Sequence, residues 1–245
     1  GNRLNYLIIK NAIAGIQIGY PSDYRTPVLE ISNSQIINVS FAGIYAFGAD
    51  ILCYNTVIAN SAGPAVALLR GGKYRFMHCT LSNNGVPGTS RTNPSVVITN
   101  TFNNPEYVES VGEYVYVERT GDLEMAYFYN SIVYGNFSHE IQLVNNGNNT
   151  FEYLFHHCIL KAVEDSVTEE MRSNFVNIIY NQDPLFNNDS DRYHLDYSLD
   201  TLSPAKDSGD IMLLTTYPFL QNDIADEMRN NDAGPDLGAF ERKEE

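Results

Sequence analysis

A basic turn is the segment of this chain with the clearest chemical potential. Residues 70–75 read Arg-Gly-Gly-Lys-Tyr-Arg, and His78 follows closely. Proton abstraction beside a carbonyl needs a base and a cation that neutralises the neighbouring carboxylate. Lys73, Arg75 and His78 are therefore candidate catalytic residues for such a proton abstraction, although a solvated basic turn is the commoner meaning of such a cluster. Neighbouring strands would add Tyr54 and Tyr129.

Acidic side chains are concentrated in the last third of the chain. The net charge is -15, and residues 161–245 hold 19 Asp and Glu against 7 Lys and Arg, a net of -12. This distribution argues against nucleic acid or an anionic membrane as a partner, because both require clustered cations. A solvated acidic exterior is the simple interpretation. Calcium bound by the tail is the alternative, and no cofactor is required.

Two further chemistries find little support in the residue pattern. Glycoside hydrolysis needs two opposed carboxylates, yet only Asp23, Asp50 and Asp122 are aspartates before residue 161. His156 and His157 are adjacent in sequence. Neighbouring residues of a strand point to opposite faces, so convergent zinc ligands are not expected, and metal ligands stay unassigned.

A short recurring motif indicates the elements that would position these residues. In each copy, Asn or Cys follows an apolar strand and precedes Ile, Val or Leu within three residues. Parallel repeats stacked about 4.8 Å apart would let these anchors hydrogen bond into a ladder inside a bend. Local turns rich in Asn are the alternative. The anchors are Asn11, Asn33, Asn55, Cys79, Asn130 and Cys158, and an insertion near residues 101–124 lengthens the interval after Cys79.

Aligning the anchors produces columns of equivalent residues. The residues two and four before each anchor are mostly apolar and share the face of the anchor, so this face is expected to be the interior. Arg75 and His156 interrupt these columns, and we attribute them to local distortion. A second sheet is expected at Ile44, Val66 and Ile141, which lie at the same distance after their anchors.

Outward positions of the same strands carry aromatic rings. Residues one and three before each anchor alternate with the interior and should face outward. Such a surface suits the stacking of sugar rings, because large exposed apolar patches mark interaction sites. The alternative is that the insertion or the C-terminal segment covers this aromatic strip and makes it structural. The aromatic strip consists of Tyr54, Phe76, His78, Tyr127, Tyr129, Phe155 and His157.

The three cysteines are expected to be free, buried and without a catalytic role. Cys79 and Cys158 would lie two repeats apart, roughly 9–10 Å, which exceeds the span of a disulfide. Cys53 is placed in the column of Met77 rather than beside Cys79.

The repeats resemble the pectate-lyase-like β-helix superfamily, and the tail resembles the choice-of-anchor Q region of bacterial surface proteins. The tail resemblance is the more specific, although Leu237 and Phe240 depart mildly from its closing pattern. It implies a secreted or cell-surface location, reached through an N-terminal signal that has been removed, and no assured enzymatic activity. The matching segments are residues 183–186, 193–195, 203–210, 226–229 and 234–241.

Together, these features predict an all-β protein: a single-stranded right-handed parallel β-helix of about six coils, with an insertion near 101–124 and an irregular C-terminal cap. Residues 1–160 are assigned to the coils, with further coils expected before Gly1. Residues 161–245 are assigned to the last coils and an acidic cap or anchor-type segment of the same domain. The apolar run 211–220 would pack across the last coil or along a flank.

The function predicted from the sequence is that of a non-catalytic module that binds a glycan or displays a neighbouring domain. A calcium-assisted lyase that acts on acidic polysaccharide through the basic turn is the alternative. The expected partner is a polysaccharide or cell-surface glycan. We expect no nucleic acid partner, no transmembrane segment and a monomeric chain.

Overall fold

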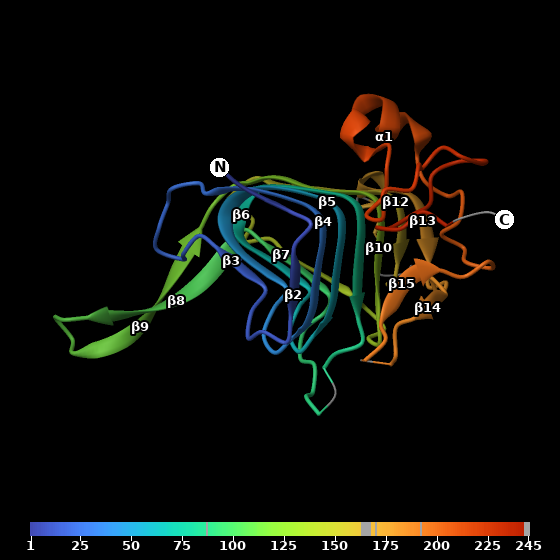
Figure 1. Cartoon of the computed structure of the whole chain (residues 1–245). Coiled ribbons are helices and arrows are strands. Elements are labelled where there is room, and N and C mark those ends of the chain that lie inside the picture. Colours follow the sequence, from blue (N-terminus) through green and yellow to red (C-terminus); the bar gives the residue numbers. More distant parts are fainter. Residues whose placement is uncertain (87, 163–167, 170, 192, 243–245) are drawn as a thin grey trace.

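The computed structural model describes residues 1–86, 88–162, 168–169, 171–191 and 193–242, and it is dominated by one large sheet. This sheet has eleven strands, and its central path runs β1-β4-β5-β6-β10-β12-β13 in chain order, with parallel pairing throughout (Figure 1). The all-β class and the parallel pairing predicted from the sequence are confirmed. Two short antiparallel pairs, β8 with β9 and β14 with β15, lie outside it.

The elements have the following bounds. The large sheet contains β1 (Asn2–Asn5), β2 (Ile8–Lys10), β3 (Ile16–Ile18), β4 (Val28–Val39), β5 (Ile44–Ser61), β6 (Val66–Asn83), β7 (Val96–Thr99), β10 (Leu123–Gly135), β11 (Ile141–Val144), β12 (Phe151–Leu160) and β13 (Phe175–Tyr180). The other elements are β8 (Thr101–Val108), β9 (Glu113–Thr120), β14 (Phe186–Asn188), β15 (Asp196–Leu199), the 3-10 helices η2 (Arg172–Asn174) and η3 (Pro218–Leu220), and the helix α1 (Ile211–Thr216).

Sharp bends divide the long strands of this sheet. Within β5, Gly48, Asn55 and Asn60 have φ values of +54°, +46° and +54°, so the strand changes direction at three points along its length. Gly and Asn are the residues that adopt this left-handed conformation most readily. Strands that bend in register and enclose one core are compatible with a parallel β-helix.

The stacked bends confirm part of the predicted ladder and correct the rest. Register places Asn33, Asn55 and Asn130 in one column, but His78 and His157 occupy this column where Cys79 and Cys158 were expected. All residues of this first column have φ between 46° and 53°. Asn11 belongs instead to a second column of bends with Asn38 and Asn60. The first column is Tyr6, Asn33, Asn55, His78, Asn130, His157 and Asn177.

The hydrogen bonds of the ladder run between neighbouring repeats on the outside of the bend, not inside it as predicted. Asn55 donates to Asn33 Oδ1 at 3.1 Å, and Asn130 Nδ2 lies 3.1 Å from His78 Nε2. The C-terminal segment covers the column, because Arg229 donates to Asn55 Oδ1 at 3.1 Å and Asp210 N donates to Asn130 Oδ1 at 2.8 Å.

In two repeats the bend lies one residue earlier than predicted. Because alternate strand residues face opposite ways, this shift exchanges the inward and outward residues of those repeats. Phe76 and Phe155 face the interior in place of Met77 and His156. Arg75 faces outward, so the local distortion predicted at Arg75 and His156 is not needed.

Aromatic rings fill the core where these repeats stack. Phe76, Phe128, Phe155 and Phe175 form a stack of nearly parallel rings, with centroids 4.7 to 5.3 Å apart. On the second predicted sheet, Ile44, Val66 and Ile141 share a column, as expected, and register adds Ile16 and Val96. The core therefore runs continuously along the stack.

The three cysteines are free and buried, as predicted. Cys79 lies opposite Ser131, which lies opposite Cys158, so these two thiols are two repeats apart. Cys53 is opposite Phe76 rather than Met77, and its sulfur lies 3.7 Å from that of Cys79. Burial raises the pKa of the Cys158 thiol to about 12, which makes it a poor nucleophile.

Two segments extend from the main sheet (Figure 1). The insertion predicted near 101–124 contains the antiparallel hairpin of β8 and β9, which projects from the sheet. The C-terminal segment, residues 183–191 and 193–242, packs along one flank of the stack. Two positions were predicted for its apolar run 211–220, across the last coil or along a flank. The run lies along the flank, because Leu213, Leu214 and Leu220 form one buried cluster with Met77.

Candidate functional site

The C-terminal segment closes much of the predicted aromatic strip. The rings of Tyr54 and Phe219 are 4.6 Å apart, and His78 has no exposed surface. Phe76 and Phe155 do not face outward as predicted but lie in the core. This arrangement matches the alternative in which the C-terminal segment covers the strip. A glycan-binding role for the strip stays a prediction. The remaining members, Tyr127, Tyr129 and His157, are partly buried.

The three candidate lyase residues do not converge on one site. Lys73 Nζ lies 2.7 Å from Glu124, and Arg75 Nη2 lies 4.0 Å from Asp50, both on the outer surface. His78 is covered by the C-terminal segment, where burial and the charge of Arg229 hold its imidazole pKa well below the usual value.

The acidic tail uses several of its carboxylates for its own backbone. Asp223 accepts hydrogen bonds from the backbone N–H groups of Ala225, Glu227 and Glu241. Asp236 similarly accepts from the backbone of Asp207 and Arg242. These bonds order the tail, and the predicted use of the tail for calcium stays a prediction.

A polar pocket of about 440 Å³ forms where the bends of successive repeats meet the base of the hairpin. Close approach of the backbones explains the glycines there. A side chain at Gly71 would place its Cβ 2.3 Å from Asp122 O, and Gly72 N donates to the same oxygen at 2.8 Å. The pocket is lined by Tyr24, Thr26, Gly48, Asp50, Arg70, Gly72, Lys73, Thr120, Gly121, Asp122 and Glu124.

Arg70 is the unusual residue of this pocket. It is only 4% exposed, its Nη2 donates to Asp23 O at 2.6 Å, and the Tyr24 ring stands 4.6 Å from its guanidinium carbon. The buried Nε and Nη1 have no hydrogen-bond partner among the described residues. A buried donor without a partner costs about 1–3 kcal/mol, and more when it is charged. Sequence reasoning treated Arg70 only as part of a basic turn, because burial is not visible in sequence.

Acceptors and an aromatic face surround Arg70. Tyr24 is 62% exposed, and Arg119 Nη1 donates to its hydroxyl at 3.5 Å. Asp122 accepts from Thr150 N at 2.9 Å, and the bonds from Thr150 and Asn149 lower the pKa of its carboxyl. The lining thus combines two cations with three carboxylates, a balance that suits a ligand with many hydroxyl groups. The charged members are Arg70, Lys73, Asp50, Asp122 and Glu124.

Comparison with known proteins gives no match: no protein-family model, curated protein or solved structure matches the chain. Over the described part of the chain, none of the helices has the length and apolar character needed to cross a membrane. The functional assignment therefore depends on the geometry of the sites.

Proposed function

We propose that this chain is a right-handed parallel β-helix that binds a neutral glycan in the Arg70 pocket. The observation that carries the proposal is the polar pocket of about 440 Å³, in which Lys73 and three carboxylates line the space beside an exposed tyrosine ring. Sugar hydroxyl groups donate to carboxylates and accept from cations, and an aromatic face packs against the apolar side of a sugar.

The charge balance of the pocket favours a neutral sugar over a uronate. Lys73 is already paired with Glu124, and Asp50 and Asp122 add negative charge. Neighbouring carboxylates repel an acidic ligand and accept hydrogen bonds from hydroxyl groups. The same balance weakens the lyase alternative, which needs cations to neutralise a substrate carboxylate.

The test is a glycan array followed by calorimetry with the best neutral ligand. Tyr24→Ala and Asp50→Asn should each weaken binding about tenfold, since they remove a stacking ring and a charged acceptor. Tyr116→Ala is the matched control, because Tyr116 is 78% exposed on the far part of the hairpin. Absence of any neutral ligand, or equal affinities in all four proteins, would refute the proposal.

The lyase alternative has a separate readout. Incubation with acidic polysaccharides and calcium should yield no unsaturated product, and product that disappears in Lys73→Ala and Arg75→Ala would favour the enzyme instead. A location outside a bacterial cell is also part of the proposal, on the basis of the tail resemblance alone. Surface labelling of cells that express the full-length protein tests it.

A further inference from the structure

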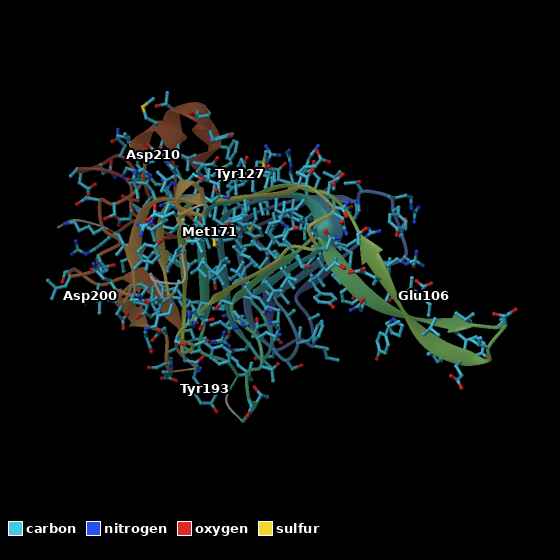
Figure 2. The ribbon with its side chains drawn as sticks, turned by 180° about the vertical axis from the view of Figure 1, so that it is seen from behind. Glu106, Tyr127, Met171, Tyr193, Asp200 and Asp210 are labelled. Atoms are coloured by element: carbon cyan, nitrogen blue, oxygen red, sulfur yellow. The ribbon has the colours of Figure 1, made fainter. Side chains whose placement is uncertain are left out.

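Two histidines and an aspartate meet at the junction of β12 and α1, away from the Arg70 pocket. His156 Nδ1 lies 3.1 Å from His157 Nδ1 and 3.9 Å from Asp210 Oδ2. The ligand atoms of all three residues lie within 4.8 Å of one another. Figure 2 labels Asp210 beside the C-terminal helical region, and Figure 1 shows β12 beneath it.

The left-handed bend brings the adjacent histidines together. Because His157 has φ of +50°, it leaves the alternation of the strand, and its ring approaches that of His156 at 4.5 Å between centroids. The expectation that these two residues point to opposite faces is therefore wrong. The alternation of side chains between two faces holds only for extended strands, so it does not apply at the bend of His157.

Asp210 is held in place by hydrogen bonds to Asn130 of β10 and to the first turn of α1. Its backbone N–H and C=O both bond the side chain of Asn130, and its Oδ1 accepts from Met212 N at 2.9 Å at the start of α1. This leaves Oδ2 directed toward His156. His156 and Asp210 are each about one-quarter exposed, so an ion can reach them.

We propose that His156, His157 and Asp210 bind a divalent transition-metal ion of the Zn²⁺ type. Zn–ligand bonds of about 2.0–2.2 Å place tetrahedral ligand atoms roughly 3.4 Å apart, and the separations of 3.1 and 3.9 Å bracket this value. Two imidazoles and one carboxylate are a ligand set that zinc uses with water in the fourth position. This inference is independent of the proposed glycan function.

Asn177 supplies the outer contact that such a site needs. Its side-chain amide lies 3.1 Å from His157 Nε2. An amide presents either nitrogen or oxygen, and with its oxygen forward it accepts the Nε2–H that a metal-bound imidazole carries. The ion would join a strand of the large sheet to the start of α1, and would therefore stabilise the docked C-terminal segment.

Zn²⁺ titration of the full chain tests this site. We expect one ion per chain, and loss of affinity by about 100-fold or more in His157→Asn and Asp210→Asn, since each removes a direct ligand. Asn at 157 suits the left-handed bend, as at the equivalent Asn130, and Asn at 210 keeps the cap on Met212 N. His139→Ala is the control, because His139 is exposed elsewhere.

Two measurements separate metal binding from folding. Zn²⁺ should raise the thermal midpoint of the wild-type protein and of His139→Ala, but not that of His157→Asn. In the wild-type protein, Zn²⁺ should slow modification of His156 and His157 by diethyl pyrocarbonate and leave the modification of His194 unaffected. Absence of stoichiometric binding, or unchanged affinity in His157→Asn and Asp210→Asn, overturns the assignment.

Discussion

At the scale of single residues, the left-handed bends determine which side chains can meet. Asn55 combines two roles, because its φ is +46° and its side chain bonds Asn33, Asn222 and Arg229. His157 occupies the same column and brings its ring beside that of His156. One backbone conformation therefore supports both the ladder and the proposed metal site.

Substitutions at Asn55 should separate the backbone role from the hydrogen-bonding role. Asn55→Ala loses the side-chain bonds and forces Ala into the left-handed region, whereas Asn55→Gly loses only the bonds. We expect Asn55→Ala to lower the free energy of unfolding by about 1 kcal/mol more than Asn55→Gly does. Urea unfolding measures the difference, and equal losses would contradict the assigned role of the bend.

At the scale of elements, the stacked phenylalanines hold successive strands together. The Phe128 ring lies between those of Phe76 and Phe155, within 9° of parallel with both. The hairpin of β8 and β9 shows the opposite case, since most of its side chains face solvent and it contributes little to the core.

Truncation of the middle ring should therefore be costly. Phe128→Ala should lower the free energy of unfolding by about 3–5 kcal/mol, since it removes a large buried side chain and leaves a cavity. Tyr116→Ala in β9 should change it by no more than about 0.5 kcal/mol. Chemical denaturation of both variants provides the comparison, and similar losses would mean that the stack is not a main source of stability.

At the scale of the whole molecule, the C-terminal segment is fastened by a buried charge network. Arg229 is fully buried, donates to Glu241 at 3.2 Å and also bonds the carbonyls of Gly238 and Ala239. Burial raises the pKa of Glu241 to about 8, although the charge of Arg229 acts in the opposite direction. Burial also raises the pKa of Asp236.

This network predicts a pH dependence of stability. Because the folded pKa of Glu241 is above its unfolded value, the folded state holds a proton that the unfolded state releases. The resulting stability is present below the unfolded pKa and is lost as pH rises toward 8. Glu241→Gln should therefore flatten the decline in unfolding midpoint between about pH 5 and 8. An unchanged decline would contradict this role of Glu241. A smaller decline should remain in Glu241→Gln, because burial also raises the pKa of Asp236.

The sequence alone determined the repeat, the parallel stacking, the aligned Asn33, Asn55 and Asn130, and the position of the insertion, because these follow from local periodicity and from the preference of Asn for tight bends. The sequence pattern wrongly predicted Cys79 and Cys158 at the bends, because small residues fit both the bend and the neighbouring inward column. A shift of one residue then reversed the orientation of Phe76 and Phe155.

Only the tertiary structure decided how distant segments meet. Contacts between the C-terminal segment and the stack closed the aromatic strip, buried His78 and set Asp210 beside the two histidines. The partnerless donors of Arg70 likewise depend on Tyr24 and on bends far apart in the chain. Such contacts join residues separated by long stretches of sequence, and local periodicity carries no information about them.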